Sequence, residues 1–201
     1  MKKFGFTLAE ILVTMGIIGV VAAMTAPVLM TNVKNQSYAT KLRTTVNDLE
    51  NAFSMAIAAE KAEDLTGTSL WNIGETSTVR NRNTFTNNLS RYLKFNTVAG
   101  NGHDFYPAAS PLRSMNADGT PGVNAFYSAN DIPFRLKNGA IIFYEYGGGQ
   151  SATIGIDVNG LDGPNVLGRD VHNFLLMEDA TINPNFAWTT RLVNNNYQFD
   201  Y

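Results

Sequence analysis

The hydrophobic pattern of the chain begins with a long apolar run near its N-terminus. Residues 11–30 include no charged side chain, and a helix needs about 20 apolar residues to cross the hydrocarbon core of a membrane. Lys2 and Lys3 precede the run, which predicts a cytoplasmic N-terminus with the remainder of the chain outside. A cleaved secretory signal peptide, with alanines at positions 22–26 as a weak cleavage site, is the alternative. The run is longer than the usual signal core of about 7 to 15 residues, which favours a retained membrane helix.

After Met30 the apolar positions recur at three- and four-residue steps, which predicts an amphipathic helix continuing the apolar one. Together they predict one helix from about Phe6 to about Glu63, on the order of 85 Å long, with Pro27 as a kink inside it. We expect the stripe to pack into the core of a globular domain. Its members are Tyr38, Leu42, Val46, Leu49, Phe53 and Ile57.

The rest of the chain predicts a small antiparallel sheet laid on that stripe, so the predicted fold class is α+β. Asn138 and Gly139 separate two apolar runs and indicate a tight hairpin turn. Turn residues over 64–69 end the long helix. The further predictions are a helix over 82–95, a surface loop over 99–122, the hairpin over 133–146, and strands over 151–160, 172–178 and 186–193.

Composition narrows the choice of function. The chain has 201 residues, a net charge of -2 and no cysteine. This excludes disulfides, thiolate nucleophiles and cysteine-based metal sites, and no global basic field attracts nucleic acid. Arg80, Arg82, Arg91 and Lys94, with aromatic residues between them, are the one local basic group, which is more typical of a solvated helix face than of a nucleic-acid site.

The sequence has no pattern typical of an enzyme. Its two histidines, His103 and His172, stand in no metal-binding spacing, and the glycine-rich stretch around Gly147 lacks the lysine of a phosphate loop. We therefore expect no catalytic residue.

The opening residues "GFTLAE", followed by about twenty apolar residues, resemble the processing signal of type IV pilins and type II secretion pseudopilins. The resemblance implies a leader over 1–5 that a prepilin peptidase removes between Gly5 and Phe6, followed by methylation of the new amine. It implies an assembly half of the helix over 6–30 and a pilin-like domain over 31–201. Ala9 stands where the family usually has a larger aliphatic residue, a minor departure.

Glu10 is the acidic residue of this signal, at the edge of the apolar run. Cleavage would free the α-amine of Phe6, four residues before Glu10 and on the same helix face. The resemblance implies that Glu10 pairs with the amine of a neighbouring subunit during assembly; pairing with its own amine is the alternative. At about 4 Å and an effective dielectric of 20, such a pair is worth about 4 kcal/mol.

The resemblance implies a structural subunit of a pilus-like or pseudopilus filament. Its implied partners are further copies or other pilins, the prepilin peptidase, the inner-membrane assembly platform and cytoplasmic membrane lipids. The implied location is the inner membrane, with the C-terminal domain outside, and then the filament. The alternative is a monomeric binding domain, membrane-anchored or secreted, in which "GFTLAE" is coincidental.

A second candidate site is a glycine-rich loop near the C-terminus, "DVNGLDGPNVLGRD". Calcium binds six to eight oxygen ligands, and the composition of the loop suits it, although the spacing is not that of an EF-hand. Asp and Asn beside Gly also form ordinary turns, which is the competing interpretation. Some type II pseudopilins carry calcium in their C-terminal loop, and this resemblance favours a site here without fixing its ligands. Its candidate ligands are Asp157, Asn159, Asp162 and Asp170, with Asn165 nearby.

Overall fold

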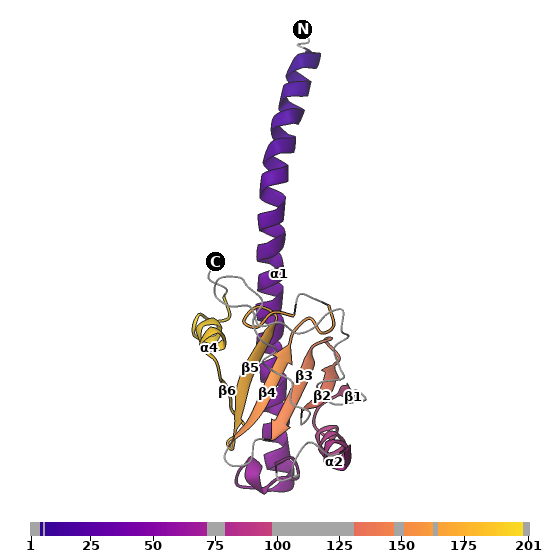
Figure 1. The fold of residues 1–201 in the computed structure, drawn as a ribbon, viewed down its shortest axis with the longest axis vertical. Helices are drawn as coiled ribbons and strands as arrows, with labels where there is room; N and C mark the ends of the chain where they lie inside the picture. Colours follow the sequence, from indigo (N-terminus) through magenta and orange to yellow (C-terminus); the bar gives the residue numbers. More distant parts are fainter. Residues whose placement is uncertain are drawn as a thin grey trace. The chain divides into compact units, whose positions relative to one another are not determined.

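The computed structural model describes residue 5 and residues 7–71, 79–97, 131–146, 151–162 and 165–198. The chain divides into two compact units, residues 1–37 and residues 38–201. A long helix, six strands and shorter helices confirm the predicted α+β class (Figure 1). In chain order the elements are α1 (Leu8–Glu60), η1 (Leu65–Gly67), α2 (Val79–Leu89), β1 (Phe95–Thr97), β2 (Ile132–Leu136), β3 (Ile141–Tyr146), β4 (Ser151–Asp157), β5 (Val171–Met177), β6 (Ile182–Pro184) and α4 (Ala187–Asn194).

The six strands form one antiparallel sheet in the order β1-β2-β3-β4-β5-β6. Each strand pairs with its neighbours in the sequence, so β1 and β6 are the two edges of the sheet. The predicted strands over 151–160 and 172–178 correspond to β4 and β5. β1 and β6 were not predicted, because each has three residues and neither alternates clearly.

The β2–β3 hairpin confirms the prediction made from Asn138 and Gly139. Gly139 has a φ of +86°, and the backbone N–H of Leu136 donates to the carbonyl of Ala140 at 2.9 Å. The Asn138 carboxamide accepts from the N–H of Ala140 at 3.0 Å and donates to the Thr45 hydroxyl on α1 at 3.1 Å. The turn residues thus set the register of the hairpin and bind it to the helix.

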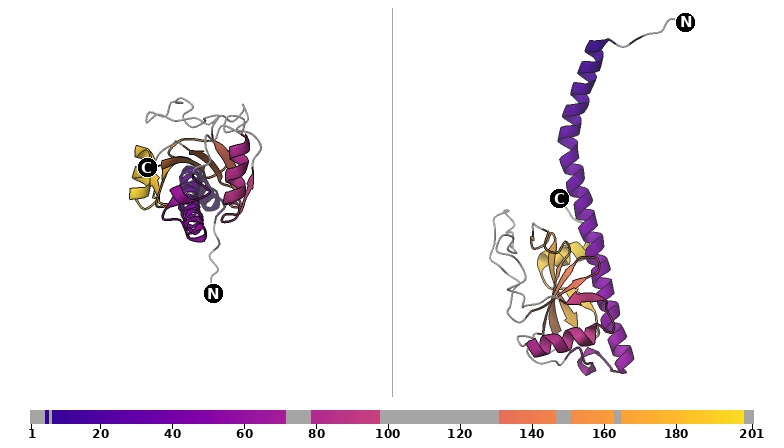
Figure 2. Two further views of the ribbon diagram at one scale, coloured as in Figure 1. Left: turned by 90° about the horizontal axis from the view of Figure 1, so that it is seen from below. Right: turned by 90° about the vertical axis from the view of Figure 1, so that its right-hand side faces the viewer.

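The C-terminal part of α1, from Tyr38 onward, packs along one face of the sheet, and Figure 2 shows the two layers edge-on. The predicted stripe forms the core. Leu42, Leu49 and Phe53 are at most 1% exposed, whereas Tyr38 and Ile57 are partly buried at its margin. Burying a large apolar side chain contributes about 1.5 to 3 kcal/mol, so this stripe fixes the sheet against the helix.

Helix α1 ends through a left-handed residue followed by a 3-10 turn. Lys61 has a φ of +54°, and the N–H of Ala62 donates to the carbonyl of Ile57 at 3.1 Å, which is the Schellman pattern. The predicted end of the helix near residues 64–69 is therefore correct to within a few residues.

Two predicted elements differ from the structure. The helix expected over 82–95 is α2, which ends at Leu89, and Phe95 instead begins β1 opposite Leu136. The strand expected over 186–193 is the helix α4, in which Thr189 and Leu192 are buried at helical spacing. In both places the pairing and packing partners, which the local pattern does not contain, decide the structure.

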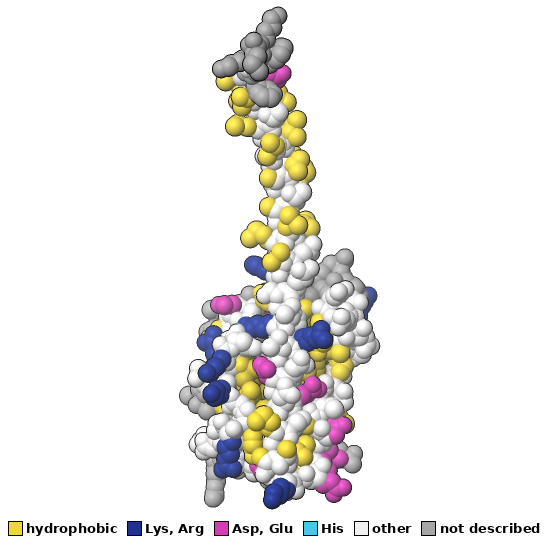
Figure 3. Space-filling model, turned by 180° about the vertical axis from the view of Figure 1, so that it is seen from behind, with side chains coloured by type: hydrophobic (Ala, Val, Ile, Leu, Met, Phe, Trp, Pro, Cys, Tyr) yellow, Lys and Arg dark blue, Asp and Glu magenta, His cyan; other side chains and the backbone are white. Residues whose placement is uncertain are grey.

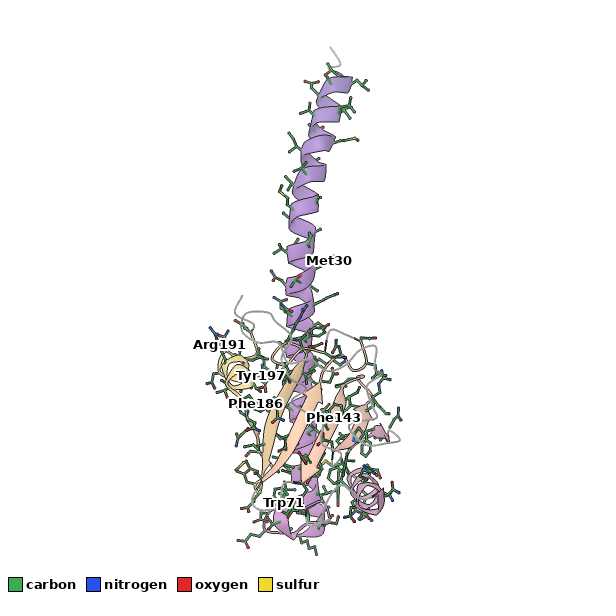
Figure 4. All side chains as sticks on the ribbon, in the orientation of Figure 1. Met30, Trp71, Phe143, Phe186, Arg191 and Tyr197 are labelled. Carbon is green, nitrogen blue, oxygen red and sulfur yellow. The ribbon has the colours of Figure 1, made fainter. Side chains whose placement is uncertain are left out.

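Figure 4 shows Phe186, Arg191 and Tyr197 around α4, beside the β6 edge of the sheet. Tyr197 packs against the core, so the segment after the sheet contributes to the same domain. The loop expected over 99–122 lies outside the described residues.

Candidate functional site

The N-terminus of α1 is closed by a capping box between Thr7 and Glu10. The backbone N–H and the hydroxyl of Thr7 each donate to Glu10 Oε2 at 2.8 Å, and the N–H of Glu10 donates to Thr7 Oγ1 at 3.3 Å. A carboxylate three residues after the cap satisfies otherwise unpaired helix donors and interacts favourably with the helix dipole. Glu10 is therefore held at the start of α1 by the chain itself, with its side chain exposed.

The predicted cleavage pair is only half described. Gly5 is exposed, and a Cβ placed on it would meet no atom within 4 Å. Packing therefore does not require glycine at this position. Phe6 lies outside the described residues, so the roles of Gly5, Phe6 and Glu10 stay predictions.

Residues 8–30 of α1 are exposed throughout and largely apolar. Helix α1 is long and apolar enough to cross a membrane by length and composition. Its threonine hydroxyls are also satisfied within the helix. Thr14 donates to the carbonyl of Glu10 at 2.9 Å, Thr25 to that of Val21 at 2.9 Å, and Thr31 to that of Pro27 at 3.1 Å. Hydroxyls bonded in this way need no water, which suits a helix in lipid.

In the second candidate site, both buried aspartates accept hydrogen bonds from the backbone of their own loop. Asp157 Oδ1 accepts from the N–H of Asn159 at 3.1 Å and of Gly160 at 2.9 Å. Asp170 accepts from the N–H of Asn165 at 2.9 Å and of Val166 at 2.6 Å. These bonds are those of a loop held in shape by its carboxylates.

Among the described residues, no three acidic or histidine side chains lie close enough to hold a metal. The Asn159 amide donates to the backbone carbonyl of Asp162, whose own side chain is exposed. Burial raises the pKa of the Asp170 carboxyl, against the hydrogen bonds that lower it. Calcium binding by Asp157, Asn159, Asp162 and Asp170 stays a prediction, and the structure gives the loop's carboxylates a turn-forming role without it.

His172 lies on β5 beside this loop and is fully buried. Its Nε2 lies 3.2 Å from the carbonyl oxygen of Arg169, and its Nδ1 is buried with no hydrogen-bond partner in the described part of the chain. Burial lowers the pKa of this imidazole to about 4. His172 is therefore neutral at ordinary pH.

The local basic group does not present its aromatic residues to a ligand. Phe85 is fully buried and stacks on Tyr144 with a centroid distance of 4.1 Å. The Tyr92 hydroxyl donates to Glu60 Oε1 at 3.1 Å. Neither ring is placed to stack on a nucleic-acid base, as single-strand binding requires.

Comparison with known proteins supports the interpretation of the N-terminus. Residues 1–26 match the family model of the prokaryotic N-terminal methylation motif, the signal of type IV pilins and pseudopilins. The motif implies processing by a prepilin peptidase and assembly with other pilin subunits. Together with the apolar helix, it fits a membrane-anchored protein. No curated protein and no solved structure matches the chain.

The capping role of Thr7 was not predicted from the sequence, in which Thr7 was only matched to a position of the processing signal. Its spacing to Glu10 is the Thr-x-x-Glu pattern of a capping box, and this pattern alone would have predicted the interaction.

Proposed function

We propose that the chain is a structural, non-catalytic subunit of a filament, either of the type IV pilus kind or of the type II secretion pseudopilus kind. It is inserted in the cytoplasmic membrane with its C-terminal domain outside, cleaved between Gly5 and Phe6, and polymerised through the N-terminal half of α1. The observation that carries the proposal is the methylation motif over residues 1–26, which continues into an exposed apolar helix.

The capping box supports a specific part of this proposal. In lipid an unpaired carboxylate is costly, and Thr7 supplies Glu10 with two donors before any neighbour arrives. Both donors meet the same oxygen, Oε2, and no bond to Oε1 is found among the described residues. The carboxylate is thus positioned at the helix start and can take a further donor from the free amine of a neighbouring subunit.

Mass spectrometry of the mature N-terminus tests the processing step. We expect a chain that begins at a methylated Phe6. A chain that begins at Met1, or between residues 22 and 26, would contradict the proposal and favour the monomeric anchored or secreted domain.

A substitution at Glu10 tests the assembly step. Glu10→Gln should abolish incorporation into filaments while leaving cleavage after Gly5 largely intact, because only the charge of the carboxylate is removed. Asp48→Asn, which neutralises an exposed carboxylate elsewhere on α1, is the matched control. Filament assembly by Glu10→Gln at the wild-type level, seen by electron microscopy of sheared material, would refute the role of Glu10.

A further inference from the structure

Two neighbouring segments at one edge of the sheet are rich in cations, and the carboxylate next to them, Asp131, is buried. The segments 79–97 and 132–140, which hold α2, β1, β2 and the β2–β3 turn, contain six Lys or Arg residues and no Asp or Glu. In the sheet, Asn96 of β1 lies opposite Arg135 of β2, so the two segments are neighbours. We call this surface the basic edge; its members are Arg82, Arg91, Lys94, Arg135 and Lys137.

Most of the basic edge is open to solvent. Arg91, Lys94, Arg135 and Lys137 are exposed, and Arg82 is half-buried. Arg91 acts on the carboxylate of Glu60 and contributes to lowering its pKa. The other exposed cations of the basic edge form no ion pair with a described residue.

The opposite side of the sheet carries an acidic corner made of two adjoining loops. Glu63 and Asp64 follow α1, and Glu178 and Asp179 form the β5–β6 turn. The N–H of Leu65 donates to the carbonyl of Glu178 at 2.8 Å, which joins the two loops. We call these four carboxylates the acidic corner. Lys61, directly after the end of α1, is the only Lys or Arg next to Glu63 and Asp64 in the sequence.

Local hydrogen bonds favour the ionised form of two of these carboxylates. Asp64 Oδ1 accepts from the Thr66 N–H at 2.8 Å, and Asp179 Oδ1 accepts from the Thr181 N–H at 3.0 Å. The hydrogen bonds of the Thr66 and Thr181 side chains lower the pKa values of Asp64 and Asp179. Figure 3 shows Lys and Arg along one margin of this domain and Asp and Glu along the lower part of the other.

The sheet order places these surfaces apart, since β1 and β2 are at one edge and β5 and β6 at the other. Arg91 acts on Glu60, close to Glu63 in the chain, but no ion pair joins the basic edge to the acidic corner among the described residues. Between two copies the two surfaces can pair, through a head-to-tail contact in which different surfaces meet; repetition of such a contact generates an open filament instead of a closed dimer.

We propose that the basic edge docks on the acidic corner of a second copy of this chain, so that charge sets the lateral register of the C-terminal domains. This inference rests on the proposed filament function. A second copy is favoured over nucleic acid because the chain itself supplies the complementary charge, while its net charge is -2 and Phe85 is buried. Complementary charges fix register and disfavour wrong partners.

The test uses the full chain in membranes of cells that assemble it, and the absence of native cysteine makes it specific. Asn96→Cys and Asn183→Cys place one thiol on an exposed position beside each surface. A flexible bis-maleimide should then link successive copies into a ladder of trimers and longer species. A single cysteine gives dimers at most and is the control for the chemistry.

Charge reversal tests the pairing. Arg135→Glu with Lys137→Glu should lower the ladder yield about tenfold, because like charges at an interface are repulsive. Glu63→Lys with Glu178→Lys should do the same, since neither side chain forms a hydrogen bond or ion pair with a described residue. Combining all four changes should restore the ladder to within about twofold of wild type. Glu145→Lys, which reverses a half-buried carboxylate outside both surfaces, should leave it unchanged.

The outcomes separate this inference from the function on which it rests. Normal filaments with a ladder that neither reversal changes would overturn the docking proposal, leave filament assembly standing and assign the basic edge to another anion. Loss of the ladder in both reversals without recovery in the combination would also overturn it. Absence of filaments and ladder from the unreversed chain would overturn the filament function and, with it, this contact.

Discussion

Acidification should destabilise the globular domain through one residue, His172. Its imidazole is fully buried, one nitrogen lacks a partner in the described chain, and its pKa is about 4 instead of the usual 6.5. The folded state therefore binds this proton later than the unfolded state as pH falls. The contribution of neutral His172 is fully present above about pH 6.5 and is lost as pH falls toward 4. From these two pKa values, the loss between pH 7.5 and pH 5 is about 2 kcal/mol.

The interval from pH 7.5 to pH 5 isolates this effect. The lowered pKa values of Asp64 and Asp179 change the stability only below pH 5, where carboxyl groups ordinarily titrate. The raised pKa of Asp170 acts in the opposite direction, because the folded state then binds the proton more readily and gains stability as pH falls. Glu60, whose pKa is lowered by hydrogen bonds from Ser69 and Tyr92 against the effect of burial, begins to add to the loss of stability near pH 5. The contribution of His172 is therefore the part of the pH dependence that His172→Leu removes.

Urea unfolding of a soluble fragment beginning near Thr31, followed by the fluorescence of buried Trp71, measures the effect. With a slope of about 2 kcal/mol per molar urea, the midpoint should fall by about 1 M between pH 7.5 and pH 5. His172→Leu should remove most of this dependence, whatever its effect on stability at pH 7.5. His103→Gln, at the only other histidine, is the control. If the pH dependence of the urea midpoint persists in His172→Leu, or disappears in His103→Gln, His172 is not its source.

Three further predictions follow from the same geometry. Leu49→Ala should destabilise the fragment by about 2 to 5 kcal/mol in urea, whereas Met55→Ala, exposed on the same helix, should stay within about 0.5 kcal/mol; equal effects would contradict the core. Bound calcium would raise the melting temperature of the fragment over that in chelator, and Asp157→Ala should abolish the difference; an unchanged wild-type curve at millimolar calcium removes the site. Thr7→Val should weaken the cap of α1 by about 0.5 to 2 kcal/mol and reduce filament yield, with recovery in Thr7→Ser; normal yield in Thr7→Val would show that Glu10 needs no cap.

Features that depend on local sequence were predicted well. The stripe of α1 was found because its period is that of a helix, and the hairpin because Gly139 adopts the positive φ that a tight turn needs. α4 was assigned as a strand because Thr189, Thr190 and Val193 favour strands locally, while the burial of Leu192 at helical spacing becomes visible only in the fold. The edge strands depend almost wholly on their partners.

In the candidate site, too, the features that depend on local sequence could be predicted and those that depend on distant partners could not. Gly5, Phe6 and Glu10 were found by resemblance to a signal, and the Thr7 cap was available from spacing alone. The His172 nitrogen that has no partner among the described residues could not be predicted, because its burial depends on the pairing of β5 with β4 and on the loop that brings the Arg169 carbonyl to the other nitrogen. Likewise the cations of the basic edge come from two segments more than thirty residues apart, which β1–β2 pairing brings together. A sequence scan registers only the first of those segments as a basic group.

Helix α1 contains two kinds of sequence, and this allows assembly and folding to be perturbed separately. Residues 8–30 are exposed and largely apolar, so changes there leave the core untouched. From Leu42 onward one face is buried and the other is solvated, so changes on the buried face act on the stability of the domain. A variant such as Glu10→Gln should therefore alter incorporation at unchanged unfolding free energy of the C-terminal fragment, because that fragment does not contain the residue. Leu49→Ala should lower the unfolding free energy of the domain, and it should reduce incorporation into filaments only because the domain unfolds.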